Sequence, residues 1–384
     1  MAVNLQLNCQ EFELSASFQL QLEFLQMKKS LIALAVLGAS SVAFAASNVT
    51  LYGLIDTGVL VQKAKHQDTT VGLNSGFVSG SRWGIKGVED LGNGYNVGFV
   101  LEEGYDSDTG ANTASNSSGK VFGRESQLYV QGGFGKLGFG RFGTLGSGAG
   151  SYHMLTGWAL TTSYGLSSWT SEIGTSFSRV DNAVVYVTPN FNGLTLSAMY
   201  SNKMKGDDQA EKWSKNNHYY GIGAKYKANA ITSSLIFEAK QIKEAADTNK
   251  NTQYAINFGF EYNLGSVTPM FAYQYAWQDE GKKTNMFGLS AKVPVAGGDV
   301  LAGARYLFGK DKSLPAAGDQ DVNSWNIGAA YVYPLSKRTK LNAYAGYADS
   351  GKGWKDRSTK AADATAITPV YNGYQLYVGM VHTF

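Results

Sequence analysis

The residues that could carry out covalent chemistry are few and widely separated along the chain. Histidine occurs four times, at positions 66, 153, 218 and 382, and the single cysteine is Cys9. No serine, histidine and acidic residue stand together as a hydrolase would need, and no His-Glu-x-x-His motif supplies metal ligands. The sequence therefore predicts no enzyme, no cofactor and no metal site.

Charged side chains inside alternating segments suggest a different chemistry, the selection of ions. Successive side chains of a β-strand point to opposite faces, so Arg82 and Lys86 share one face of segment 81–86 and the apolar residues share the other. Glu102 likewise lies on the strand face opposite to the apolar residues of segment 97–101. On the inner wall of a closed barrel, such charges would act on every ion that passes.

The composition favours long strands and excludes a nucleic-acid binder. The chain of 384 residues has 46 Gly and only 6 Pro, with 19 Phe, 23 Tyr and 7 Trp. Aromatic residues are enriched in strands, and glycines suit the tight turns that join them. Its 33 basic and 30 acidic residues give a formal charge of +3, and no basic patch is interleaved with stacking aromatics.

The N-terminal region has the pattern of an export signal that starts at Met27. Lys28 and Lys29 precede an apolar run, and small residues at 43 and 45 fit a cleavage site. A membrane anchor is the alternative, but the run is shorter than the roughly 20 residues that span a bilayer. We expect residues 1–26 to be a wrongly assigned extension and residues 27–45 to be the signal peptide. Residues 46–384 would then form the mature barrel.

Strand signals with a period of two recur from residue 49 to the end of the chain. Segments 254–262 and 325–333 each place apolar residues on one face and small or polar residues on the other. Several apolar faces begin or end in an aromatic residue, as the interface girdles of membrane barrels do. A soluble β-sandwich also alternates, but it would carry more charge on its outer faces.

Short and long connections alternate between these segments, which predicts sixteen strands. Seven turns are short and eight loops are long, so both termini lie on the short-turn side, and an even strand number lets the barrel close. The short turns are 89–95, 132–136, 189–193, 227–230, 263–266, 294–298 and 334–339. The long loops are 62–77, 105–121, 143–178, 201–217, 241–252, 278–283, 309–323 and 349–370.

The last predicted strand, 371–384, ends the chain on the aromatic Phe384. Counting back by twos from Phe384 gives a mainly apolar face. Because lipid offers no partner for an unpaired strand edge, we expect this strand to pair with the first one, 49–60, and to close the barrel.

The chain resembles the trimeric general porins of Gram-negative bacteria, especially the neisserial and burkholderial type. The matching stretches occur in the family's order along nearly the whole mature chain. They are SNVTLYGLIDTGV (47–59), SRWGIKGVEDLGNG (81–94), Gly123-Arg124, GKLGFGRFG (135–143), DNAVVYVTPNFNGLTLSAMY (181–200) and VGMVHTF (378–384).

The resemblance implies a 16-stranded antiparallel barrel in the outer membrane, a homotrimer surrounded by lipid, and a third loop folded into the lumen. It also implies passive diffusion of small hydrophilic solutes and ions through a charged constriction. By position, the wall charges of that constriction are Arg82, Arg124, Arg179 and Glu102, with Arg141 and Lys86 as further candidates.

The third loop departs from the family, whose members often carry acidic residues there. Segment 143–171 has no acidic residue, and the first carboxylate is Glu172. A cationic wall without an anionic counterpart predicts a preference for anions. The alternative is a channel specific for sugars or organic acids, in which the loop aromatics bind solute. The candidate loop residues are Tyr152, His153, Trp158 and Trp169.

Three other interpretations remain open. His153 could act as a pH switch because histidine titrates near neutral pH, although a solvated loop histidine is the simpler reading. The aromatic loop residues could pack the loop against the wall instead of binding solute. A soluble exported adhesin or lectin fits poorly with the terminal strand and with the asymmetry of turns and loops.

Overall fold

The fold was obtained as a computed structural model. It describes residues 49–112, 120–160, 164–169, 179–207, 209, 212–241, 243, 252–278, 281–316, 318–355 and 372–384. The predicted extension and signal peptide, residues 1–45, lie outside the described residues, as does Glu172. These assignments stay predictions.

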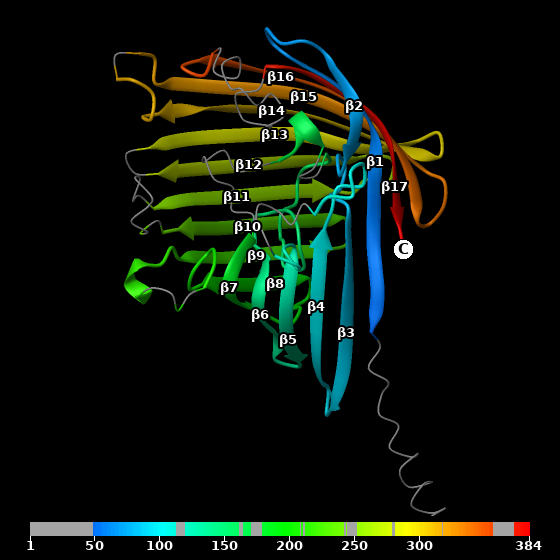
Figure 1. The fold of residues 1–384 in the computed structure, drawn as a ribbon, viewed down its shortest axis with the longest axis vertical. Coiled ribbons are helices and arrows are strands. Elements are labelled where there is room, and N and C mark those ends of the chain that lie inside the picture. The colour runs from blue at the N-terminus through cyan, green and yellow to red at the C-terminus, as the bar shows by residue number, and fades with distance from the viewer. Residues whose placement is uncertain are drawn as a thin grey trace, which may run out of the picture. The chain divides into compact units, whose positions relative to one another are not determined.

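The described chain is built from antiparallel strands in one sheet. Figure 1 shows β10 to β16 side by side in sequence order, with β17 beside β1. The strands are β1 (Thr50–Ala64), β2 (Thr70–Ser75), β3 (Arg82–Gly92), β4 (Tyr95–Gly104), β5 (Glu125–Gly132), β6 (Gly135–Gly143), β7 (Arg179–Val187), β8 (Leu194–Ser201), β9 (Tyr219–Ala228), β10 (Ile231–Lys240), β11 (Gln253–Tyr262), β12 (Thr268–Gln278), β13 (Lys282–Val295), β14 (Gly298–Asp311), β15 (Asp321–Pro334), β16 (Thr339–Lys352) and β17 (Gly373–Thr383).

Seventeen strand segments occupy sixteen positions of the wall. One edge of β1 pairs with β17 along its length. Its other edge pairs with β3 over Thr50–Leu54 and with β2 over Thr57–Gln62. Segments β2 and β3 are therefore one wall strand interrupted at residues 76–81, and the predicted sixteen-stranded closed barrel is confirmed. The prediction that 62–77 is entirely loop is wrong, because β2 lies within it.

The barrel closes where the first and last strands meet. Register pairs run from Leu54 with Thr383 to Ala64 with Gly373. Gly53 and Phe384 then exchange two backbone hydrogen bonds of 3.1 Å. A side chain at Gly53 would collide with the Phe384 ring, so glycine provides the space in which that ring sits.

The buried apolar residues gather where the third loop packs on the inner wall. Loop 3, the connection between β6 and β7, is described at 144–160 and 164–169 and contains a short 3-10 helix, Gly165–Ser167. One buried cluster joins Leu145, Tyr152 and Met154 to wall residues. Another joins Trp158 and Trp169 to wall residues farther round the barrel. The predicted inward fold of loop 3 is therefore confirmed.

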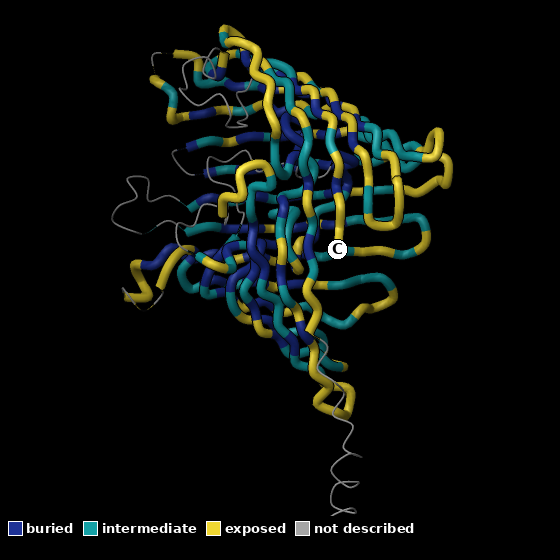
Figure 2. The backbone as a smooth tube through the Cα atoms, turned by 45° about the vertical axis from the view of Figure 1, so that its right-hand side comes forward, coloured by how far each residue is buried: buried dark blue, intermediate teal, exposed yellow. Residues whose placement is uncertain are grey.

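Burial alternates along the strands as the period of two requires. Figure 2 shows buried and exposed stretches following one another along the wall and exposed residues at the hairpin turns. Among the described residues, no helix is long and apolar enough to cross a membrane.

Candidate functional site

Two arginines share one carboxylate on the inner wall. The Arg124 Nε donates to Glu102 Oε1 at 2.7 Å, and the Arg82 Nη1 lies 3.9 Å from the same oxygen. Tyr52 donates its hydroxyl to Glu102 Oε2 at 3.1 Å. Glu102 is 7% exposed, and the structure thus brings together three of the residues that the sequence singled out.

The interruption between β2 and β3 positions Arg82. The buried carboxylate of Asp56 accepts hydrogen bonds from the backbone of Val78 at 2.7 Å and of Ser79 at 2.6 Å. The Tyr377 hydroxyl also donates to it at 2.8 Å. This bend presents the Gly80 carbonyl to the Arg82 Nε at 3.0 Å. The sequence analysis missed Asp56, although its inward parity on β1 was a visible signal.

Arg179 completes a cluster of three guanidinium groups. Its Nε donates to the Arg124 carbonyl at 3.0 Å. The side chains of Arg82, Arg124 and Arg179 are close enough to repel one another electrostatically. We call these three residues the arginine cluster. Glu102 is the carboxylate bonded to it, so the charge of the group stays positive.

Arg141 braces the wall and the segment that leads into β5. Its Nε donates to the Gly123 carbonyl at 2.7 Å, and its Nη1 donates to Asp181 at 2.5 Å. Asp181 also forms a salt bridge with Lys120. These contacts tie Arg141, a further candidate for the constriction, to β7 and to the segment before β5. The sequence did not single out Asp181 or Lys120 as its partners.

Lys86 lies apart from the arginine cluster. It is four residues from Arg82 on β3, which is about 13 Å toward the short-turn end at about 3.3 Å per residue. Its Nζ lies 5.0 Å from the centre of the Tyr52 ring.

Carboxylates of the wall hold loop 3 by its backbone. Glu125 accepts from the Ser151 N–H at 2.6 Å, Glu238 from Gly146 at 3.1 Å, and Glu261 from Gly157 at 2.9 Å. Each of these acidic side chains is thereby engaged by a neutral donor. Beyond them, Leu166 donates to Gln375 of β17 at 3.0 Å, so the loop extends across the barrel interior.

Glycines on the inner face of the wall make room for the loop. A Cβ atom at any of these positions would collide with a loop-3 residue, and the loop residues advance along the chain as the strands advance round the barrel. The pairs are Gly138 with Tyr152, Gly223 with Met154, Gly259 with Thr156, Gly288 with Trp158 and Trp169, Gly303 with Trp158, and Gly328 with Ser167. We call this set the glycine track.

The aromatic residues of loop 3 are engaged in packing. The Tyr152 hydroxyl donates to Gln127 at 2.5 Å. The Trp158 Nε1 donates to the Ser167 carbonyl at 2.7 Å, and its ring lies 5.5 Å from that of Trp169. His153 is exposed, with Nδ1 2.8 Å from the Gly150 carbonyl. A cavity of about 240 Å³ reaches the edges of His153, Trp158 and Trp169.

Within the described parts of loop 3 no acidic side chain faces the arginine cluster. Among the described residues, no three histidine, cysteine or acidic side chains converge on one point where they could hold a metal ion. The chemistry that the site offers is electrostatic: a fixed positive field on one side of the lumen.

Comparison with known proteins decides the family. Residues 30–353 match the family described as Gram-negative porin. The chain belongs to the Gram-negative porin family. This porin is 32% identical to Outer membrane porin protein 32 of Delftia acidovorans, over 89% of this chain and 94% of the relative. It is 30% identical to Major outer membrane protein P.IB of Neisseria meningitidis serogroup A, over 76% and 93% respectively.

A solved structure agrees with the fold of this porin. The anion-selective porin from Comamonas acidovorans superimposes with a TM-score of 0.66 at 27% identity, covering 88% of this chain and all of that one. The protein is thus an outer-membrane β-barrel whose strands cross the membrane, and it is a channel for passive diffusion of small hydrophilic solutes and ions.

Proposed function

We propose that this porin prefers anions. The observation that carries the proposal is the arginine cluster: three guanidinium groups lie together, Glu102 is the carboxylate bonded to two of them, and the described part of loop 3 offers backbone and neutral side chains. Fixed cations in a narrow passage bounded by protein of low dielectric concentrate counter-ions and repel ions of like charge.

The engagement of the wall carboxylates supports the same preference. Glu125, Glu238 and Glu261 would oppose the arginines if they were solvated in the lumen, but each accepts hydrogen bonds from loop 3. The likeness to the anion-selective porin from Comamonas acidovorans also supports it.

Two opposite charge changes test the proposal in planar bilayers under a salt gradient. Arg179→Gln removes a cation and is expected to lower the anion-to-cation permeability ratio by about threefold, the effect of one unit charge a few ångströms away in water. Glu102→Gln keeps an acceptor for Tyr52 and is expected to raise the ratio. Lys310→Gln, at a 70% exposed side chain at the loop end, is the matched control and should change nothing. Cation preference in the unmodified protein would reject the proposal.

The alternative of a channel that selects sugars or organic acids through the aromatic residues of loop 3 has weaker support. A stacking track needs aromatic faces open to solute, and Trp158 and Trp169 are buried against each other and against glycines of the track. Saturable block of the conductance by a neutral sugar would favour this alternative, and we expect none. The role we propose is transport without a catalytic step.

We also propose that three copies assemble into a ring, with β17, β1 and β2 facing a neighbour. The outward side chains of β11 and β12 are mostly aromatic, as lipid interfaces favour. The outward side chains are mainly aliphatic and exposed in the middle of β17 and along β1 and β2. They include Leu376, Val378, Ile55 and Val59. An exposed aliphatic strip of this kind fits contact with another subunit better than contact with lipid.

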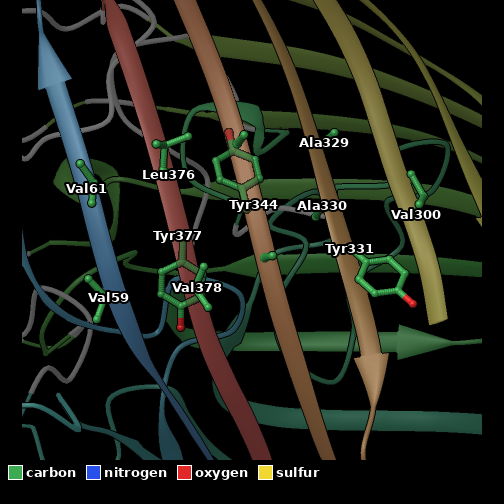
Figure 3. Close-up of a pocket in the computed structure, with 12 residues that line it drawn as sticks. Val59, Val61, Val300, Ala329, Ala330, Tyr331, Tyr344, Leu376, Tyr377 and Val378 are labelled. Atoms are coloured by element: carbon green, nitrogen blue, oxygen red, sulfur yellow. The ribbon is translucent and has the colours of Figure 1, made fainter. Parts of the chain in front are cut away.

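Complementary features lie on the two sides of β1. On one side, a groove of about 660 Å³ runs over β14 to β17 (Figure 3). Its floor includes the small side chains of Ala329, Ala343 and Ala345, and Leu376 and Val378 border it. On the other side, Val71 and Leu73 of β2 protrude with 68% and 66% exposure.

The register places the groove and the protruding residues at one height. Val59 of β1 pairs with Val378 on one edge and with Leu73 on the other. Among the described strands, β2 pairs in register with β1 alone, and an unpaired strand edge is costly at membrane depth. A second copy of the chain, seated with its groove against β2, would cover both. Contacts between different faces of identical subunits generate a closed ring when the rotation between neighbours closes, and we propose that it closes at three copies.

A further inference from the structure

A second group of cations lines the lumen at the short-turn end. A cavity of about 540 Å³ is bordered there by Lys292 of β13, Lys340 of β16, and Lys337 and Arg338 of the turn between β15 and β16. The same cavity reaches Tyr164 of loop 3. We call the four basic residues the turn-end collar.

Most of the charge of the collar is uncompensated. Lys292 forms a salt bridge of 3.1 Å with Asp299, the one acidic residue that borders the cavity. Lys337, Arg338 and Lys340 are exposed and form no salt bridge with any residue in the part of the chain that the structure describes. Four cations and one carboxylate leave three positive charges around a single cavity.

The turn that carries these cations is held firmly. The Ser336 hydroxyl accepts hydrogen bonds from the Arg338 N–H at 3.1 Å and from the Thr339 N–H at 3.0 Å. The Arg338 carbonyl accepts from Thr383 of β17 at 2.8 Å. These bonds use backbone and serine atoms, so the basic side chains can be replaced without removing them.

The collar and the arginine cluster are carried by different strands of the wall. The cluster belongs to β3, β7 and the start of β5, whereas the collar belongs to β13, β16 and the turn before β16. Strands β17 and β1 lie between β16 and β3 in the wall. The cavity extends to Ser79, whose hydroxyl accepts a hydrogen bond from Arg82. Lys86 is about 13 Å from Arg82 along β3, which exceeds the screening length of about 8 Å at physiological salt, and the collar lies at the same short-turn end as Lys86.

We infer that the turn-end collar is a second anion site in series with the arginine cluster, and that it binds small anions carrying two or more charges, such as di- and tricarboxylates. This inference rests on the proposed anion preference. The Coulomb energy scales with the charge of the ion, so three cations around one cavity favour a polycarboxylate over chloride or acetate. The collar would hold such an anion at the mouth of the channel next to loop 3.

The test is block of chloride current by citrate in planar bilayers, with acetate as the monovalent probe, added to one side and then to the other. The collar variant is Lys337→Gln, Arg338→Gln and Lys340→Gln together. We expect citrate to block the unmodified porin at a lower concentration from one side than from the other. In the collar variant the lower value is expected to rise about tenfold, as three screened unit charges acting on a multivalent ion would give.

A matched variant controls for net charge: Lys203→Gln, Lys205→Gln and Lys212→Gln remove three lysines in the loop-end segment between β8 and β9. Its citrate block should equal that of the unmodified porin. Equal block in the collar variant and the unmodified porin overturns the inference, and so does block by acetate as strong as block by citrate. Cation preference in the unmodified porin would reject the proposed anion preference. A failure of the proposed function is therefore distinguishable from a failure of the inference about the collar.

Discussion

The sign of the field in the lumen depends on which charges are engaged by partners as well as on how many are present. On the inner wall, Glu125, Glu238 and Glu261 accept N–H groups of loop 3, and Asp181 is engaged by Arg141 and Lys120. Hydrogen bonds to a buried carboxylate satisfy its oxygens and leave them less available to passing cations. The arginine cluster has Glu102 as its bonded carboxylate, and its guanidinium groups therefore set the local sign.

His218 makes the segment between β8 and β9 sensitive to acid. Burial, together with the nearby Lys243, lowers the pKa of His218 below its usual value of about 6.5. The ring packs on Trp213 and bonds to the Trp213 carbonyl at 3.0 Å and to the Tyr200 hydroxyl at 3.2 Å. Because the neutral form is the packed form, the packing is complete above pH 6.5 and weakens as the pH falls below it.

We expect amide hydrogen exchange in residues 202–218 to accelerate severalfold between pH 7.5 and pH 5, after correction for the intrinsic rate. His218→Gln keeps a donor and an acceptor but does not titrate, so its exchange should not depend on pH in this way. His153→Gln, at an exposed ring, should behave as the unmodified protein does. A pH response that persists in His218→Gln would show that another group is responsible.

At the scale of elements, residues 152–158 of loop 3 run across the strands of the wall. Residues 152, 154, 156 and 158 each meet a glycine of the track, so alternate side chains of the loop face the wall. Extended backbone has this period of two. Two features of the wall position the loop: the glycines, which leave space for loop side chains, and the carboxylates, which accept hydrogen bonds from the loop backbone.

Gly288→Val is expected to displace the loop from the wall. A Cβ atom at Gly288 would lie 2.7 Å from both the Trp158 and Trp169 rings. Overpacking of this kind costs about 1–3 kcal/mol of the free energy of unfolding, and a loop pushed toward the lumen should lower single-channel conductance. Gly133→Val is the matched control, since a Cβ there meets nothing within 4 Å. Unchanged stability and conductance in Gly288→Val would show that the track does not position the loop.

Sequence reasoning predicted the strands because a half-buried strand carries its own signal, the period of two. It failed at β2, where the bend at 76–81 depends on Asp56 and Tyr377, residues far away in the chain. It placed Arg82 and Glu102 on the inner face from local alternation. It could not decide the role of Arg141, because Asp181 and Gly123 become its partners only after β5, β6 and β7 assemble.

At the scale of the whole molecule, the first and last strands serve two purposes. The pairing of β1 with β17 removes the edges of the sheet, which closes the barrel. Strand β17 borders the groove over β14 to β17, and β1 joins that groove to β2. The pairing of β1 with β17 therefore closes the barrel and also brings the groove next to the protruding residues of β2.

The ring assembly predicts which residues of neighbouring copies can be cross-linked. In a chain with Cys9→Ser no cysteine remains, so Leu73→Cys and Ala343→Cys supply the only thiols. A bismaleimide of short reach is expected to join them between subunits and to give covalent dimers and trimers on heated SDS gels, with no larger species because the ring closes. The control pair, Leu73→Cys with Leu235→Cys, uses an equally outward leucine on β10 and should stay monomeric. Equal products from both pairs, or a ladder extending beyond trimers, would contradict the closed ring and return the aliphatic face of β17, β1 and β2 to contact with lipid.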